Sequence, residues 1–173
     1  TETLVRFLDN VVTWNEDLNA LEKQRIAAAE TRRLGLGVMG IADMLNQLGV
    51  AYDSEQGLMM IEKVMEYITN AAYQASSFIA KEKSPSPIFD EKAYMKCPFI
   101  KEALSEQTQN AIRKNGLRNI AIMSIAPTGS ISNIVLGYKG EEKNYIGVSG
   151  GVEPVFSVFY TRRSESFGNK FFK

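Results

Sequence analysis

The chain has 173 residues, of which 45% are hydrophobic and 23% charged, and its 20 lysine and arginine residues balance 20 aspartate and glutamate residues. This composition is typical of an ordinary globular chain, and the even charge argues against a broad electrostatic attraction to nucleic acid or to an anionic membrane. The absence of histidine and the presence of one cysteine exclude a Ser-His or Cys-His nucleophile pair, an internal disulfide and a cysteine-based metal cluster.

The first predicted element is an amphipathic helix over about residues 2–16. Its apolar residues recur at helical spacing and are Leu4, Val5, Phe7, Leu8, Val11 and Val12. Residues 34–40 follow as a short apolar run punctuated by glycines. They predict a short strand or turn that leads into a helix at residues 41–45.

A long helix is predicted to begin after Asp53 or Ser54, either of which can cap it, with Gln56 placed to complete a variant of the capping box. It continues to about Lys83, because the prolines in residues 84–87 cannot extend a helix. A continuous apolar face predicts burial in a core, and it comprises Leu58, Ile61, Met65, Ile68, Ala72, Ala75 and Ile79.

Residues 88–100 are expected to form an irregular surface loop, and residues 99–114 a polar-faced helix that ends at Asn115 and Gly116. About residues 1–115 should therefore be mostly helical. About residues 116–165 differ, since a buried strand at 120–125, a tight loop, a helix at 131–136 and a strand at 155–160 follow in order, with a charged loop at 137–144 between them. Such an order predicts an α/β fold.

Glycines at positions 35, 37 and 40 match the G-x-G-x-x-G pattern of dinucleotide-binding loops. The run Gly-Leu-Gly-Val-Met-Gly also resembles the opening of hydroxyacid dehydrogenases. However, charged residues 30–33 stand where the pattern requires an apolar strand, and neither a catalytic lysine nor βαβ repeats are evident. A fragment of an NAD-dependent hydroxyacid dehydrogenase is therefore the less favoured alternative.

The segment Ala126–Ser130 places a glycine and small hydroxylated residues between the predicted strand and helix. A helix start presents unpaired amides and partial positive charge to an anion, so the segment predicts a phosphate cradle to which Thr128 and Ser130 add hydroxyl groups. The absence of a Gly-Lys-Ser/Thr sequence excludes a Walker-type loop. A turn with an ordinary helix cap explains the same residues equally well.

Two further residues carry weaker signals. Glu153 follows flexible glycines at residues 147–151 and either faces a site or stands at a bent strand entry, which local sequence favours. Cys97 lies beside Lys96, which can lower a thiol pKa, but no second cysteine is available to resolve an oxidised form, so we interpret Cys97 as incidental.

Taken in order, four motifs resemble the catalytic large chain of ribonucleotide reductases. They are Arg33–Leu45 with Tyr52–Glu55, Arg118–Asn119, Ile125–Ser132, and Gly151–Phe156 with Tyr160–Arg162. The amino-acid sequences of the phosphate cradle and of residues 149–154 most closely resemble those of the adenosylcobalamin-dependent (class II) branch. Iron- or manganese-dependent chains share most of the pattern.

The resemblance implies a fragment of a ten-stranded α/β barrel with a helix-rich N-terminal half. In that family a radical cysteine on a finger loop abstracts hydrogen from the ribose and two more cysteines reduce it. None of these cysteines is present, so residues 1–173 are expected to be one segment of a larger catalytic domain and to be inactive alone, without catalytic or metal-ligating residues.

The resemblance also implies roles for individual residues. The substrate's diphosphate or triphosphate would bind Ala126, Pro127, Thr128, Gly129 and Ser130. Gly35 and Gly37 would pack near the active centre, and Glu153 would lie at the edge of the site.

Adenosylcobalamin is the implied cofactor of the complete enzyme, with none bound by this segment alone. The implied partners are a ribonucleotide, the remainder of the same chain and a second copy in a homodimer, without nucleic acid or membrane. No run approaches the roughly 20 apolar residues of a membrane span, no signal peptide is evident, and a cytoplasmic location is expected. A non-catalytic α/β module that only packs or assembles is the alternative.

Overall fold

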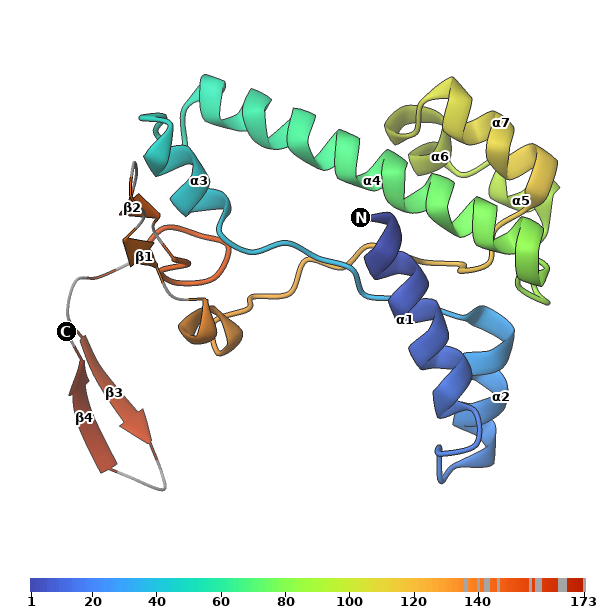
Figure 1. Ribbon diagram of the computed structural model, residues 1–173, viewed down its shortest axis with the longest axis horizontal. Helices are drawn as coiled ribbons and strands as arrows, with labels where there is room; N and C mark the ends of the chain where they lie inside the picture. Colours follow the sequence, from blue (N-terminus) through green and yellow to red (C-terminus); the bar gives the residue numbers. More distant parts are fainter. Residues whose placement is uncertain are drawn as a thin grey trace. The chain divides into compact units, whose positions relative to one another are not determined.

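The structure, a computed structural model, describes residues 1–135, 137–139, 141, 144–145, 147–155, 157, 160–164 and 168–172. The chain divides into two compact units. Unit 1 comprises Thr1–Gly37 and Met59–Ala126, and unit 2 comprises Val38–Leu58 and Pro127–Lys173. In chain order the elements are α1 Glu2–Asn15, α2 Glu22–Thr31, α3 Ile41–Gln47, α4 Glu55–Lys83, α5 Glu91–Tyr94, α6 Pro98–Ala103, α7 Glu106–Asn115, the 3-10 turn η1 Ile131–Ile134, β1 Tyr138–Lys139, β2 Asn144–Tyr145, β3 Tyr160–Ser164 and β4 Gly168–Phe172 (Figure 1).

Helix α1 confirms the amphipathic helix predicted over residues 2–16. Val5 and Asp9 on one side are inaccessible to solvent, whereas Trp14 is 75% exposed. Helix α2 ends at Thr31, and the left-handed φ of 46° at the next residue, Arg32, takes the chain out of the helix. The extended residues 34–37 follow.

The core of unit 1 is built around the second half of α4. Its buried apolar residues are Val5, Leu36, Ala72, Tyr73, Ala75, Ile79, Ile100, Leu104, Ile112, Leu117 and Ile122. The predicted apolar face of α4 is therefore part of the core from Ala72 to Ile79. Leu58, at the start of the same face, is 59% exposed.

The ends of α4 follow from local chemistry. The Ser54 hydroxyl accepts a hydrogen bond from the Gly57 amide at 3.0 Å, so Ser54 is the one of the two predicted caps that holds the helix start. The helix stops at Lys83, and Ser84 takes a left-handed φ of 73° directly before Pro85. The predicted boundaries of this helix are confirmed.

Helices α6 and α7 lie along the second half of α4 (Figure 1), where the Ser77 hydroxyl donates to the Ala111 carbonyl at 2.9 Å. The irregular loop expected at residues 88–100 is wrong, because Asp90 caps α5 and Pro98 occupies the first turn of α6. The single helix expected at residues 99–114 is also wrong. Ser105 interrupts it by capping α7, since its hydroxyl accepts from the Thr108 amide.

A cluster of charged and polar side chains around the buried Asp9 joins α1 to three other segments of unit 1. The Oδ1 atom of Asp9 accepts hydrogen bonds from Nε of Arg32 and Nδ2 of Asn119, both at 3.0 Å. The Lys83 ammonium lies 3.6 Å from Oδ2, and Nε of Arg118 lies 3.5 Å from Oδ1. Burial, followed by the positive charge of Arg32, lowers the pKa of Arg118.

Unit 2 contains α3, η1 and two antiparallel strand pairs. In the β1–β2 pair Tyr138 stands opposite Tyr145, and in the β3–β4 pair Tyr160 stands opposite Phe172. Where a charged loop is expected at residues 137–144, the described residues 138–139 and 144–145 pair as a short hairpin. Among the described helices of both units, none combines the length and apolarity that crossing a membrane requires.

The expected α/β fold, a fragment of a ten-stranded barrel, is wrong for this structure. Within the described residues the named strands form only the two antiparallel pairs, and the one parallel pairing is an isolated bridge between Leu36 and Met123. Three backbone hydrogen bonds of 2.8 Å join residues 34–36 to residues 121–124. A parallel sheet requires several strands covered on both faces. Within the described residues, segment 121–124 has one strand-like partner, residues 34–36. Ile125, directly after segment 121–124, is 50% exposed.

The helix expected at residues 131–136 is also wrong, because the described residues form only the 3-10 turn η1, and Leu136 lies outside them. Of the strand expected at residues 155–160, positions 156, 158 and 159 lie outside the described residues. Strand β3 begins at Tyr160.

Candidate functional site

The loop Pro127–Ser130 in unit 2 is shaped by hydrogen bonds from the turn that follows it. The Ser132 hydroxyl donates to the Gly129 carbonyl at 2.9 Å. The Asn133 side-chain amide donates to the carbonyls of Gly129 and Ser130 at 3.1 and 3.3 Å. The carbonyl groups of Gly129 and Ser130 are thereby directed toward η1.

The backbone amides of the same loop are the second feature of the site. In the described part of the chain, neither Gly129 nor Ser130 donates its backbone N–H to any group, and both residues are exposed. A Cβ atom added to Gly129 would meet no atom within 4 Å. Adjacent backbone amides that are not used within the protein can bind an anion without a charged side chain.

Thr128 takes a left-handed φ of 55°, which is uncommon for a β-branched residue. Its Oγ1 atom is buried and has no hydrogen-bond partner among the described residues. The Ser130 side chain, in contrast, is exposed. Of the two hydroxyl groups that the sequence offers to a phosphate, only that of Ser130 faces solvent in this structure.

Gly151 covers the Thr128 hydroxyl. It has a φ of 113°, and a Cβ atom there would collide with the Pro127 carbonyl oxygen and lie 3.1 Å from Oγ1 of Thr128. The Gly151 carbonyl accepts a hydrogen bond of 2.7 Å from the Gly40 amide, directly before α3. Only glycine fits at position 151, because both the backbone conformation and the close approach exclude a side chain.

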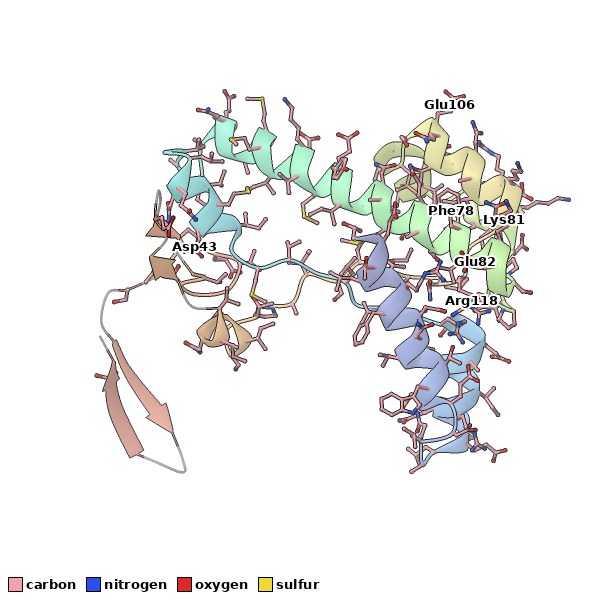
Figure 2. The ribbon with its side chains drawn as sticks, viewed as in Figure 1. Asp43, Phe78, Lys81, Glu82, Glu106 and Arg118 are labelled. Carbon is pink, nitrogen blue, oxygen red and sulfur yellow. The ribbon has the colours of Figure 1, made fainter. Side chains whose placement is uncertain are left out.

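Asp43, labelled in the first turn of α3 in Figure 2, attaches the glycine-rich segment 147–152 to this helix. Its carboxylate accepts hydrogen bonds from the Ser149 amide at 3.1 Å and the Ser149 hydroxyl at 2.6 Å. The Ala42 amide donates to the Val152 carbonyl at 3.1 Å. From sequence Asp43 is one residue of the helix predicted at 41–45, and an acid in the first helical turn signals only a favourable interaction with the helix dipole.

Gly35 and Gly37 lie in unit 1, beside Ser124. A Cβ atom on Gly37 would collide with the Ser124 carbonyl oxygen, whereas one on Gly35 would lie 3.7 Å from the Ser124 Cβ. Close packing of two extended segments therefore requires glycine at position 37.

Glu153 is exposed in unit 2, and Cys97 is exposed in unit 1 directly before α6. Within the described residues there is no group of three histidine, cysteine, aspartate or glutamate side chains that could hold a metal ion. The substrate-binding and site-edge roles implied by the resemblance stay predictions.

The complete chain, residues 1–173, matches the model of a family described as "Ribonucleotide reductase, barrel domain". It is 33% identical over 160 residues to a vitamin B12-dependent ribonucleoside-diphosphate reductase of Mycobacterium tuberculosis, an alignment covering 91% of this chain and 18% of that protein. A protein of the same name from Thermoplasma acidophilum is also 33% identical over 160 residues, covering 92% of this chain and 17% of the relative.

The alpha subunit of a ribonucleoside-diphosphate reductase of Chlamydia pneumoniae is 30% identical over 183 residues, covering 94% of this chain and 16% of the relative. The chain thus spans less than a fifth of each of these three relatives. None of the three is a dehydrogenase of hydroxyacids, so the NAD-dependent alternative gains no support from them.

Proposed function

Because the chain belongs to the family of the ribonucleotide reductase barrel domain, we propose that it is the part of a ribonucleotide reductase that holds the substrate's phosphate groups. The complete enzyme would convert ribonucleotides to deoxyribonucleotides by radical chemistry. The names of the relatives support this reaction and favour a ribonucleoside diphosphate as the substrate.

The phosphate assignment is carried by one observation: Gly129 and Ser130 are exposed residues whose backbone amides donate to no group in the described part of the chain. Backbone N–H groups bind phosphate oxygens at short range, and the missing side chain of Gly129 leaves space for the anion. The exposed Ser130 hydroxyl supplies a third donor. Since residues 126–130 contain neither lysine nor arginine, selectivity for phosphate would come from the geometry of the donors.

The role proposed for this chain is to bind and orient the substrate, and we place no catalytic residue in it. The chain has a single cysteine, Cys97, which is exposed at the start of α6 in unit 1. The cysteines that the family uses to activate and reduce the ribose would come from another part of the complete enzyme.

Two of these three relatives are named as vitamin B12-dependent, and we propose adenosylcobalamin, which would supply the radical, as the cofactor of the complete enzyme. The chain contains no histidine, and its described residues include no cluster suited to a metal ion. No residue of this chain is assigned to the cofactor, and the function proposed for the described residues concerns the substrate. A cytoplasmic homodimer is proposed for the complete enzyme from the family resemblance alone.

The phosphate assignment is tested by a two-dimensional amide NMR titration of the chain with a ribonucleoside diphosphate and, separately, with pyrophosphate. Wild type should show saturable shifts centred on Gly129 and Ser130 at millimolar ligand. Gly129→Val should weaken binding at least about tenfold while the spectrum stays dispersed, because the added branched side chain would occupy the open space beside the Gly129 backbone and obstruct the approach of a phosphate. Ser130→Ala should cost about 1 kcal/mol, the value of one hydrogen bond.

Ala51→Val is the matched control for Gly129→Val. Ala51 is exposed in the same unit and lies outside both the loop and segment 147–152, so pyrophosphate affinity should be preserved. Unchanged affinity in Gly129→Val would contradict the phosphate assignment. A dispersed wild-type spectrum that does not respond to either ligand would also contradict a preformed cradle.

A further inference from the structure

We infer that Asp43 is a positioning residue for the phosphate loop. It fixes the glycine-rich segment 147–152, and that segment in turn fixes the backbone of Pro127–Gly129. The inference rests on the function proposed above for this loop, and it adds a residue that does not itself touch the phosphate.

Asp43 is bound to one residue by both of its carboxylate oxygens. Asp43 is only 7% exposed. Its Oδ1 atom accepts a hydrogen bond from the Ser149 hydroxyl at 2.6 Å, and its Oδ2 atom accepts one from the Ser149 amide at 3.1 Å. In the described part of the chain no lysine or arginine forms an ion pair with it. A buried carboxylate without a counter-ion depends on its hydrogen bonds, so these two bonds strongly constrain where Ser149 lies.

The constraint passes from Ser149 to the loop through Gly151, two residues later. The Gly151 backbone packs so closely on the Pro127 carbonyl oxygen that a Cβ atom would not fit. The same Cβ position would lie 3.5 Å from the backbone nitrogen of Gly129, one of the two unpaired amides. Movement of segment 147–152 would therefore remove the surface against which this amide is held.

If segment 147–152 moves, the phosphate loop should lose its preorganisation. When the loop is fixed before the ligand arrives, binding does not have to order it, and affinity is higher for the same contacts. Removing the Asp43 carboxylate should release Ser149, loosen the contact at Gly151 and lower the affinity for phosphate without removing any donor of the loop.

The substitutions Asp43→Ala, Asp43→Asn and Ser149→Ala separate this role from a general effect on folding. Asparagine can still accept from the Ser149 amide and donate to the Ser149 hydroxyl, which can reverse its direction. Asp43→Ala should therefore weaken pyrophosphate binding by about tenfold and Asp43→Asn by less than about threefold. Asp53→Ala is the matched control, because Asp53 is exposed in the same unit, and it should bind as wild type does.

Two readouts are made on each variant. Amide hydrogen exchange without ligand should become faster in Asp43→Ala at Gly40 and Ala42, whose amides donate to the carbonyls of Gly151 and Val152. The pyrophosphate titration gives the affinity. In the double variant Asp43→Ala with Ser149→Ala, the affinity should equal that of Asp43→Ala, because both substitutions break the same contact.

Wild-type exchange at Gly40 and Ala42 together with unshifted Gly129 and Ser130 signals in Asp43→Ala would overturn the inference. So would additive losses of affinity in the double variant. If Asp43→Ala does not fold, Ser149→Ala decides the question, since this residue is exposed and wild-type affinity in that variant would overturn the inference. If wild type does not bind pyrophosphate, the proposed function fails, and exchange at Gly40 and Ala42 together with the Gly129 and Ser130 signals of Asp43→Ala still decides whether Asp43 positions the loop.

Discussion

Replacing Asp9 by alanine should strongly destabilise unit 1. Asp9 is 0% and Arg32 2% exposed, and the guanidinium donates to the Asp9 carboxylate at 3.0 Å. After the substitution the buried Arg32 keeps one carboxylate partner, Glu16 at 2.9 Å. Arg118 and Lys83 lose the carboxylate that lies 3.5 and 3.6 Å from them.

Breaking a buried ion pair by removing one partner costs about 3–5 kcal/mol. The remaining contact between Arg32 and Glu16 favours the lower end, so we expect a loss of about 3 kcal/mol. This is a large part of the roughly 5–15 kcal/mol that stabilises a typical domain. With a urea dependence of about 1–3 kcal/mol per molar, the midpoint should fall by about 1–3 M.

The assay is urea unfolding followed by far-ultraviolet circular dichroism, because Trp14 is 75% exposed and reports poorly on the core. The matched control is Glu82→Ala, which removes a surface partner of Arg6 and should leave the midpoint nearly unchanged. Asp9→Leu combined with Arg32→Met should recover much of the loss, because an apolar pair leaves no buried charge. Equal midpoints for Asp9→Ala and Glu82→Ala would refute the reasoning.

Gly37→Ala should destabilise unit 1 by about 1–3 kcal/mol, because the added Cβ would collide with the Ser124 carbonyl oxygen. Gly35→Ala should be nearly neutral, because a Cβ there makes an ordinary contact. Similar urea midpoints for the two variants would contradict this prediction. Burial, followed by the charge of Tyr73, raises the pKa of Tyr94, whose hydroxyl donates to the Ile120 carbonyl at 2.6 Å. Since an unfolded tyrosine ionises near pH 10 and the folded Tyr94 stays protonated, its contribution to stability should be constant below about pH 10 and be lost as the pH rises further. Tyr94→Phe should flatten this decline between about pH 9 and 11, as unfolding curves would show, and an equally steep decline in the variant would disprove the assignment.

The part of the candidate site that sequence could predict is the position of the loop, because its glycine and hydroxyl residues are adjacent in the chain. The family was also accessible from sequence, since the motifs follow one another in a fixed order. The arrangement around the loop could not be predicted. Asp43 and Ser149 are separated by 106 positions, and nothing in either local sequence specifies that they meet or that Gly151 covers the Thr128 hydroxyl.

The sequence by itself determined the elements whose signals are local. The spacing of apolar residues established α1, and the Ser54 cap and the prolines after Ser84 established the limits of α4, because each signal acts within a few residues. Tertiary structure alone decided whether residues 120–125 would belong to a sheet, and it supplied one neighbouring segment where an α/β fold requires several. It also brought Asn119 to Asp9 across 110 positions. Such pairings depend on how the whole chain packs, and packing is not encoded in the periodicity of any single segment.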